Sequence, residues 1–277
     1  MNDYGALRAA VDDGIASVTF DHPPTNLVDG AVIGALAALV DDLERDASVR
    51  VAVFRSADAD FFLMHGDVEQ LVAVPAHPFQ PATEPNIAVQ TFERLHGAPY
   101  FTIGVVDGAA RGGGCELLSA LDYRIGSPRA VIGQPEVAMG ILPGAGGTVR
   151  WPRFAGRADA LELILTGRDL DADEALAVGW LQRLVRDEDL VEAVDQLARR
   201  VAVMPRDGIA AVKRVVDASL DRRDDAWLIE TNALGALMAA GAHVDPMRRF
   251  LAAGGQTREG ETMRMASVMD AMLNRDQ

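Results

Sequence analysis

Hydrophobic and polar positions follow two different periods along this chain. Residues 15–20 (IASVTF) alternate with a period of two, and residues 49–56 (VRVAVFRS) are rich in β-branched side chains, so both segments are predicted strands. Between them, residues 30–46 carry apolar side chains at helical spacing and end in acidic residues, which predicts a helix. Strand and helix signals continue to alternate up to about residue 185.

The same two periods predict the remaining elements. We expect a strand, a bend and a short helix over 61–71, a helix near 86–97, strands at 100–108, 121–127, 130–133 and 181–185, and helices from residue 158 onward. Two stretches are too rich in glycine or proline for long regular elements: 75–85, a predicted mobile loop with four prolines, and 133–148. Alternating strands and helices followed by helices alone predict an α/β core (1–205) with a C-terminal helical region (206–277). The apolar tail stretch ALGALMAAG (233–241) is typical of a helix that packs against a neighbouring subunit.

The net charge limits the expected binding partners, and the cysteine content bears on the expected cellular location. The chain of 277 residues is 49% hydrophobic and carries a formal net charge of −15. Because an acidic surface repels phosphate groups, neither nucleic acid nor a membrane is expected as a partner. The single cysteine, Cys115, excludes an internal disulfide, and we find no secretory signal and no apolar run of about 18 residues, so we expect a cytoplasmic protein.

The stretch GGGCELLSAL (112–121) follows a predicted strand and opens a helix. Glycines at this turn allow two interpretations: close packing of helix on strand, or backbone N–H groups that point at an anion or oxyanion. A phosphate-binding P-loop is excluded because the chain has no Gly-Lys-Ser/Thr tripeptide, and the position of the turn does not fit a dinucleotide fingerprint.

Two glutamates extend the second interpretation. Glu116 lies in the first turn of the predicted helix, where a carboxylate can simply complement the helix dipole. Glu136 follows Gly-Gln-Pro among apolar residues that predict burial, although a solvated loop position is also open. Two carboxylates beside an oxyanion site could activate a water and donate a proton.

Taken together, the motifs resemble the signature of the enoyl-CoA hydratase/isomerase (crotonase) family. The resemblance covers about residues 13–205 and is carried by PPTNLVD, VRVAVFRS, GGGCEL, GQPE, PGAGGT and LTGRDLDADEALAVGWLQRLV, with only TREGE (257–261) matching beyond it. It implies a spiral of β-β-α units, with C-terminal helices that build homotrimers or dimers of trimers. It also implies an acyl-CoA thioester substrate from fatty acid metabolism, with CoA as part of the substrate and no separate cofactor. No histidine has the spacing of a metal ligand, so no metal is expected.

The resemblance also assigns the candidate site. The thioester oxygen would lie between the N–H groups of Gly66 and Gly113, while Glu136 would protonate the α-carbon and Glu116 would activate the water. These four are the predicted catalytic residues. The residues expected along the substrate are Leu63, Met64, His65, Asp67, Gly112, Pro143 and Gly144. The presence of both glutamates favours a 2-trans-enoyl-CoA hydratase. The alternatives are another crotonase-type isomerase, decarboxylase or lyase, or a non-catalytic acyl-CoA-binding subunit.

Three side chains near these motifs depart from the family or invite a second interpretation. His65 stands where the family usually has glycine: we favour an outward-packed ring, with a polar contact to substrate as the alternative. Arg111 could meet a CoA phosphate, but it fits a surface arginine better. The thiol pKa of Cys115 could be lowered by the helix dipole, although we interpret the residue as a small buried side chain.

Overall fold

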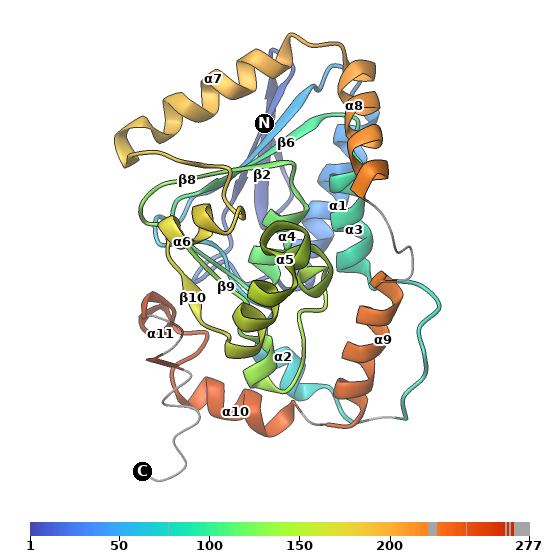
Figure 1. Cartoon of the computed structure of the whole chain (residues 1–277), viewed down its shortest axis with the longest axis vertical. Coiled ribbons are helices and arrows are strands. Elements are labelled where there is room, and N and C mark those ends of the chain that lie inside the picture. The colour runs from blue at the N-terminus through green and yellow to red at the C-terminus, as the bar shows by residue number, and fades with distance from the viewer. Residues whose placement is uncertain (77, 221–225, 242, 264, 266, 269–277) are drawn as a thin grey trace.

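Two mixed β-sheets form the centre of the molecule, and helices cover their faces (Figure 1). The computed structural model describes residues 1–76, 78–220, 226–241, 243–263, 265 and 267–268. Within these ranges the architecture is α/β, as the sequence predicts.

The larger sheet has seven strands in the order β1-β2-β3-β4-β6-β8-β11. An antiparallel meander of β1, β2 and β3 leads into strands that all pair in parallel. The strands are β1 (Asn2–Asp3), β2 (Leu7–Asp12), β3 (Ile15–Phe20), β4 (Val51–Ser56), β6 (Phe101–Val106), β8 (Tyr123–Gly126) and β11 (Arg183–Leu184).

The smaller sheet follows the larger one strand by strand. Its order is β10-β9-β7-β5, and the strands are β5 (Phe61–Leu63), β7 (Ala109–Arg111), β9 (Val131–Gly133) and β10 (Asp169–Leu170). The strands β5, β7 and β9 each come directly after a strand of the larger sheet (β4, β6 and β8), and each is followed by a helix. The chain thus climbs in repeated β-β-α turns, which confirms the predicted spiral.

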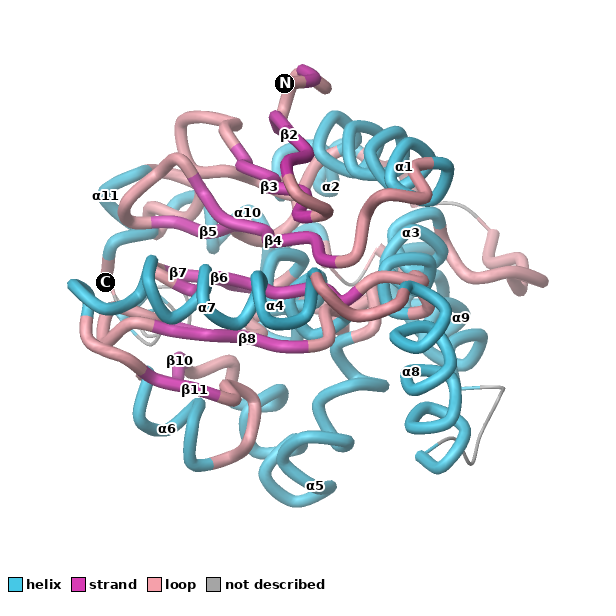
Figure 2. Tube along the Cα trace, turned by 90° about the horizontal axis from the view of Figure 1, so that it is seen from above, coloured by secondary structure: helices cyan, strands magenta, loops and turns pink. Residues whose placement is uncertain are grey.

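Helices cover both faces of the larger sheet. On one face, α1 (Gly30–Arg45), α3 (Ile87–His96) and α4 (Gly113–Ala120) close the main core, while α7 (Leu190–Ala202) lies across the other face (Figure 2). In β4, Ala52 and Phe54 belong to the main core, whereas Val51 and Val53 pack under α7. A parallel strand buried on both sides needs apolar residues at every position, which is why VRVAVFRS reads as a nearly continuous apolar run. The other short elements are α2 (Val68–Ala73), η1 (Glu136–Met139), α5 (Gly147–Thr166), α6 (Ala172–Ala177) and η2 (Asp187–Asp189).

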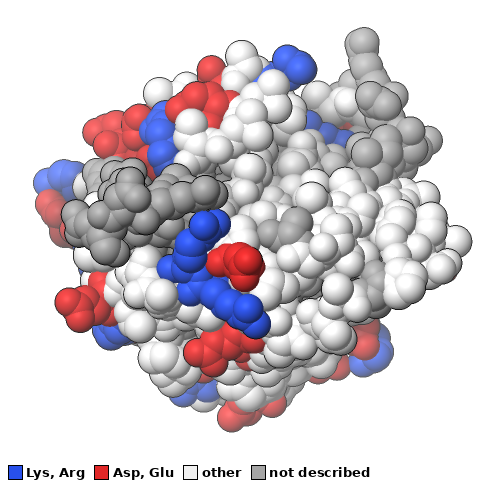
Figure 3. All heavy atoms as spheres, turned by 90° about the horizontal axis from the view of Figure 1, so that it is seen from below, with Lys and Arg blue, Asp and Glu red and all other residues white. Residues whose placement is uncertain are grey.

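In the described residues, the C-terminal region forms the helices α8 (Arg206–Leu220), α9 (Ala226–Ala239), α10 (Val244–Ala252) and α11 (Arg258–Thr262). In Figure 1, α9, α10 and α11 lie around the lower half of the molecule, whereas α8 lies at the upper right, near α1 and α3. Within α9, Leu234 and Met238 pack inward against Met139 and Met247, so this part of ALGALMAAG does not form a free face. The exposed apolar side chains gather on α8 instead, at Val212, Val215, Val216 and Leu220. Seen from below, a broad area of the surface carries neither acidic nor basic side chains (Figure 3).

Three strands were not predicted, and one helix begins earlier than predicted. The strand β2, which pairs antiparallel with β3, was missed because its alanines give no strand signal, while β1 and β10 have only two residues each. Helix α5 begins at Gly147 rather than near residue 158. It contains Pro152 and a non-helical Gly156 with φ of 75°, so only the segment after Gly156 has the regular pattern that the sequence reveals.

None of the helices in the described ranges is both long and apolar enough to cross a bilayer. The division of the chain at residue 205 into a core and a helical region stays a prediction.

Candidate active site

The three glycines of the opening turn let helix α4 start against neighbouring backbone. Gly112 has a φ of 51°, and a Cβ there would lie 2.8 Å from the His65 Cβ and 3.0 Å from the Glu136 Oε1. A Cβ on Gly114 would overlap the Leu63 carbonyl group, while the Gly114 N–H donates to the Met64 carbonyl at 3.0 Å. Both interpretations of the glycines therefore apply: the turn is tightly packed, and the packing leaves one N–H free.

That free group belongs to Gly113, at the start of α4. Within the described part of the chain, neither the Gly113 N–H nor the Gly66 N–H has a hydrogen-bond partner, and both residues line one cavity. An N–H group left unpaired beside a cavity is ready to bind an oxygen atom of a ligand. The structure thus places at one cavity the two N–H groups that the family resemblance assigns as donors.

Glu116 lies in the first turn of α4 and points into the same cavity. Its Oε1 accepts the Ala145 N–H at 2.7 Å and the Gly147 N–H at 2.8 Å. Burial raises the pKa of this carboxyl group above its ordinary value, although the two N–H groups and the charge of Arg150 oppose the shift. The loop PGAGGT therefore holds the glutamate through its backbone, since glycine and alanine leave the N–H groups accessible.

Glu136 begins η1 and lines the cavity with only 6% of its surface exposed. The Gln134 amide group donates to both carboxyl oxygens, at 2.9 and 3.0 Å, when it is oriented so that its oxygen accepts the Trp151 indole N–H at 3.3 Å. The expected burial of Glu136 is thus confirmed, and its solvated alternative is wrong.

The cavity that these groups share is about 260 Å³ in volume and otherwise mainly apolar. The apolar residues along it are Val28, Ile33, Val68, Leu71, Ala88, Met139, Ile141, Leu142, Ala145, Leu234, Met238 and Met247. A second hollow of about 430 Å³ between α1 and α2 shares Val28, Ile33, Gly66 and Leu71 with it. Together, the two hollows have room for a long ligand, with one of its ends in the apolar cavity beside the carboxyl groups and the other near the surface.

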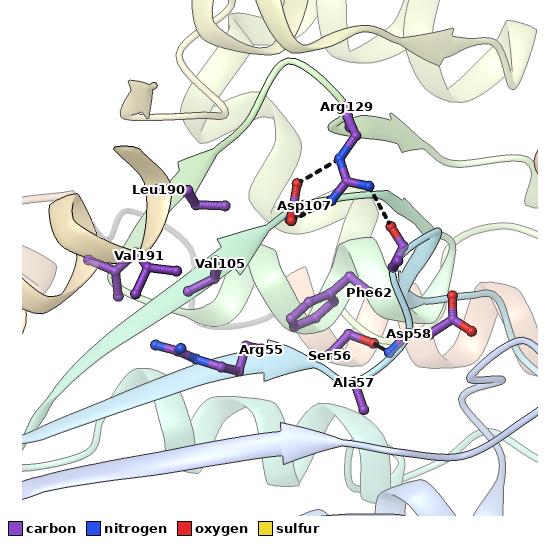
Figure 4. Close-up of a pocket in the computed structure, with 12 residues that line it drawn as sticks. Arg55, Ser56, Ala57, Asp58, Phe62, Val105, Asp107, Arg129, Leu190 and Val191 are labelled. Carbon is purple, nitrogen blue, oxygen red and sulfur yellow. Dashed lines mark hydrogen bonds and ion pairs between the residues drawn. The ribbon is translucent and has the colours of Figure 1, made fainter. Parts of the chain in front are cut away.

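Another cavity lies at the carboxyl ends of β4 and β6, a common place for ligands in α/β folds (Figure 4). It measures about 200 Å³ and contains Arg55, Asp107 and Arg129. Arg129 forms an ion pair with Asp107 at 2.6 Å and donates to the Ala59 carbonyl, while Arg55 points away from it. Asp58, the other acidic residue of this cavity, forms an ion pair with Arg258 at 2.8 Å, so both carboxylates are already paired with an arginine.

The structure places the predicted substrate residues in different surroundings. Leu63 and Met64 have fully buried side chains that belong to the hydrophobic core rather than to the cavity wall. Asp67 caps α2 and lines the outer hollow. Gly144 lines the cavity, and Pro143 lies beside Gly147 outside it. The contacts of these residues with a substrate stay predictions.

Two of the favoured placements are wrong. The His65 ring does not pack outward: it is 2% exposed, and its Nε2 lies 2.8 Å from the Glu261 Oε1 on α11. Arg111 is not a surface arginine either, because it is 2% exposed and forms a bidentate ion pair with Asp169. Both residues face the C-terminal segment, whose position could not be deduced from local sequence.

Cys115 is completely buried, as we expect, but the direction of its pKa shift is not the one that the helix dipole favours. Burial raises the thiol pKa well above its ordinary value, and the charges of Glu136 and Glu116 add to that shift.

We therefore expect Cys115 to resist alkylation in the folded protein. Iodoacetamide at pH 8 should modify the native thiol at least about 100-fold more slowly than the urea-unfolded thiol, since both burial and a raised pKa suppress the thiolate. Mass spectrometry of timed samples measures both rates. Comparable rates would contradict the placement of this side chain.

The raised pKa of Glu116 also predicts how stability changes with pH. Its folded pKa lies above the ordinary value of 4.5, so the carboxyl group stabilises the fold below that pH and loses this contribution as the pH rises through the folded pKa. Glu116→Gln cannot ionise and keeps an oxygen for both N–H groups. It should therefore unfold at higher urea at pH 7.5, by about 0.5 to 2 kcal/mol, and match wild type near pH 4. A variant that is less stable at pH 7.5 would refute this.

The comparison with known proteins agrees with this arrangement of groups. The model of the enoyl-CoA hydratase/isomerase family matches residues 10–240 of the chain. The chain belongs to the enoyl-CoA hydratase/isomerase family.

No group of three or more His, Cys, Asp or Glu side chains in the described ranges could hold a metal ion.

Several solved structures share the fold. A Streptomyces avermitilis protein, provisionally named an enoyl-CoA hydratase, is 33% identical, with a TM-score of 0.86 and coverage of 98% of this chain and 99% of its own. DspI from Pseudomonas aeruginosa is 28% identical, with a TM-score of 0.71 over 83% of this chain and 93% of its own. An enoyl-CoA hydratase from Bacillus anthracis, at 24% identity and a TM-score of 0.71 over 86% and 89% of the two chains, supports the fold alone.

Proposed function

We propose that the protein is an enoyl-CoA hydratase, which adds water across the 2,3-double bond of a 2-trans-enoyl-CoA. One observation carries the proposal: two buried carboxyl groups and two unpaired backbone N–H groups line the same small cavity. Membership of the family supplies the acyl-CoA thioester as the class of substrate. The apolar walls of the cavity suit an acyl chain.

The N–H groups of Gly66 and Gly113 would bind the thioester oxygen. Attack on the β-carbon moves negative charge onto that oxygen, which gives an enolate. Each preorganised donor aimed at such an oxygen typically lowers the barrier by about 3 to 4 kcal/mol. Gly113 begins α4, whose next residue donates to the Met64 carbonyl, and Gly66 follows Met64 by two residues, so little reorganisation is needed when the charge develops.

The two glutamates would divide the acid–base work. Glu116, oriented by Ala145 and Gly147, accepts a proton from the water whose oxygen bonds to the β-carbon. Glu136, oriented by Gln134, gives its proton to the α-carbon and collapses the enolate. Proton exchange with solvent then restores both groups. Hydration needs both roles, whereas simple isomerisation typically relies on one carboxylate.

We also propose the setting of this activity. CoA enters as part of the substrate and no further cofactor takes part. The exposed apolar side chains of α8 support assembly of the C-terminal helices into a homotrimer or a dimer of trimers. A cytoplasmic location and a role in fatty acid metabolism fit the single buried cysteine and the acyl-CoA substrate.

The product made from crotonyl-CoA tests the reaction type. In D₂O we expect 3-hydroxybutyryl-CoA with one deuterium at the α-carbon, detected by NMR. A shifted double bond, loss of carbon dioxide or another cleavage product would replace the hydratase with a different reaction of the same family. CoA esters that bind without any conversion would point to a non-catalytic acyl-CoA-binding subunit.

A further inference from the structure

Four buried ionisable side chains join the proposed oxyanion site to the C-terminal segment (residues 256–263). His65 and Glu261 form one pair at 2.8 Å, and Arg111 and Asp169 form the other at 2.8 Å. Glu261 and Asp169 have about 1% of their side-chain surface exposed, and His65 and Arg111 have 2%. Charges buried to this extent are costly unless each is paired and hydrogen-bonded, so the cluster requires an explanation.

Both ring nitrogens of His65 lie within hydrogen-bond distance of an oxygen atom. Its Nδ1 lies 2.9 Å from the Gly66 carbonyl oxygen, which can only accept, and its Nε2 faces the Glu261 carboxyl group. Glu261 also accepts the Gln256 N–H at 2.7 Å and lies 3.5 Å from an Arg111 nitrogen. Burial raises the pKa of Glu261, but His65, the Gln256 N–H and Arg111 lower it more, so its net shift is downward. The imidazole thus donates from Nδ1 to the Gly66 carbonyl and shares a second hydrogen bond with the Glu261 carboxyl group.

The C-terminal segment also holds the residues on the far side of Gly66. The Gln256 Oε1 accepts the Val68 N–H, and the Gln256 Nε2 donates to the Asp67 Oδ1 at 3.2 Å. Contacts to His65, Asp67 and Val68 thus enclose Gly66, whose own N–H stays unpaired in the cavity.

The other half of the oxyanion site is attached to the same segment. Arg111, two residues before Gly113, donates to the Glu261 carbonyl at 2.8 Å and to the Met263 carbonyl at 3.0 Å. One glutamate, 196 residues away from His65 in sequence, therefore contacts both of the chain segments that carry the two N–H donors.

We propose that Glu261 is a positioning residue that fixes the Gly66 and Gly113 N–H groups relative to each other through His65 and Arg111. The inference rests on the proposed oxyanion role of those two N–H groups. Glu261 does not line the cavity and acts only through its neighbours. A displacement of about 1 Å at a reacting centre can lower the rate by a factor of about 100. A buried ion cluster that fixes the spacing of the two donors would therefore preserve the rate.

Isotope-edited infrared spectroscopy of bound butyryl-CoA, labelled with ¹³C at the thioester carbonyl, tests the proposal. Butyryl-CoA has no double bond, so the measurement does not depend on hydration. Wild type should lower the carbonyl stretching frequency relative to free ligand. Glu261→Gln should lose at least half of that shift and about 10- to 100-fold in kcat with crotonyl-CoA, while its affinity for butyryl-CoA stays within about threefold of wild type.

Two further variants separate positioning from general loss of stability. Asp122→Asn breaks an ion pair with Lys213, at 2.8 Å and with both side chains 11% exposed, outside the cavity, and should keep the full carbonyl shift. Gln256→Gly removes the contacts to Asp67 and Val68 but suits the backbone φ of 61°, so it should fold and lose part of the shift. If Glu261→Gln does not fold, Gln256→Gly is the variant that tests the positioning role.

A full wild-type shift in folded Glu261→Gln, or an equal loss in Asp122→Asn, would overturn the proposal. If Glu261→Gln does not fold, a full shift in Gln256→Gly would do so. If wild type lowers the carbonyl frequency but does not convert crotonyl-CoA, the hydratase assignment fails while the positioning role is still judged by the variants.

Discussion

Glu136→Gln is expected to reduce kcat for crotonyl-CoA hydration by about 1,000-fold, within the range that a positioned general acid contributes. The amide keeps the size of the carboxyl group but has no proton to give to the α-carbon. The KM should change little, because the apolar walls and the two N–H groups that bind the ester are untouched. Steady-state loss of the enoyl-thioester absorbance measures both constants.

A surface glutamate provides the matched control for this substitution. Glu69 lies on α2, close to Gly66 in sequence but exposed and outside the cavity, so Glu69→Gln should keep wild-type kcat. Glu116→Gln should lose activity to a similar degree, and the double variant with Glu136→Gln should lose far less than the product of the two effects, since the groups act in one step. More than a tenth of wild-type activity in Glu136→Gln would exclude it as the proton donor.

Gly114→Ala is expected to cost at least about 4 kcal/mol of stability or to prevent folding. A Cβ there would occupy the space of the Leu63 carbonyl, which belongs to strand β5 and cannot move without breaking the smaller sheet. Backbone has fewer ways to relax than a side chain, so the effect should exceed ordinary overpacking, which costs about 1 to 3 kcal/mol. Urea unfolding followed by circular dichroism measures it.

Gly34→Ala makes the same glycine-to-alanine substitution at a position with free space, and serves as the control. Gly34 lies on the exposed side of helix α1, and a Cβ there meets nothing within 4 Å. Alanine is the better helix former by about 0.5 to 1 kcal/mol, so this variant should be slightly more stable than wild type. If Gly114→Ala proved as stable as Gly34→Ala, the close contact between α4 and β5 would be wrong.

Much of the site could be predicted because its parts lie within short motifs. Glu116 and Gly113 are fixed by one strand-to-helix turn, and their chemistry follows from the local chain direction. Glu136 was predicted to be buried from its apolar neighbours, which the structure confirms. That all of these reach one cavity with Gly66 follows from the resemblance to the family rather than from periodicity.

The surroundings of these residues could not be predicted, because they depend on contacts between distant segments. Nothing near His65 in the sequence indicates Glu261, so an exposed ring was the natural expectation. Likewise, Arg111 follows an ordinary strand pattern, and its partner Asp169 is supplied by β10, a strand of two residues. The N–H groups of Ala145 and Gly147 that orient Glu116 lie in a stretch whose glycines conceal any regular pattern.

The most direct test of the central claim is the turnover of crotonyl-CoA by the purified wild-type protein, with Glu136→Gln as the blank. The account predicts steady loss of the conjugated enoyl-thioester absorbance in wild type and almost none in the variant. Tight binding of the CoA ester without loss of absorbance, with crotonyl-CoA or a longer 2-trans-enoyl-CoA, would contradict the hydratase assignment.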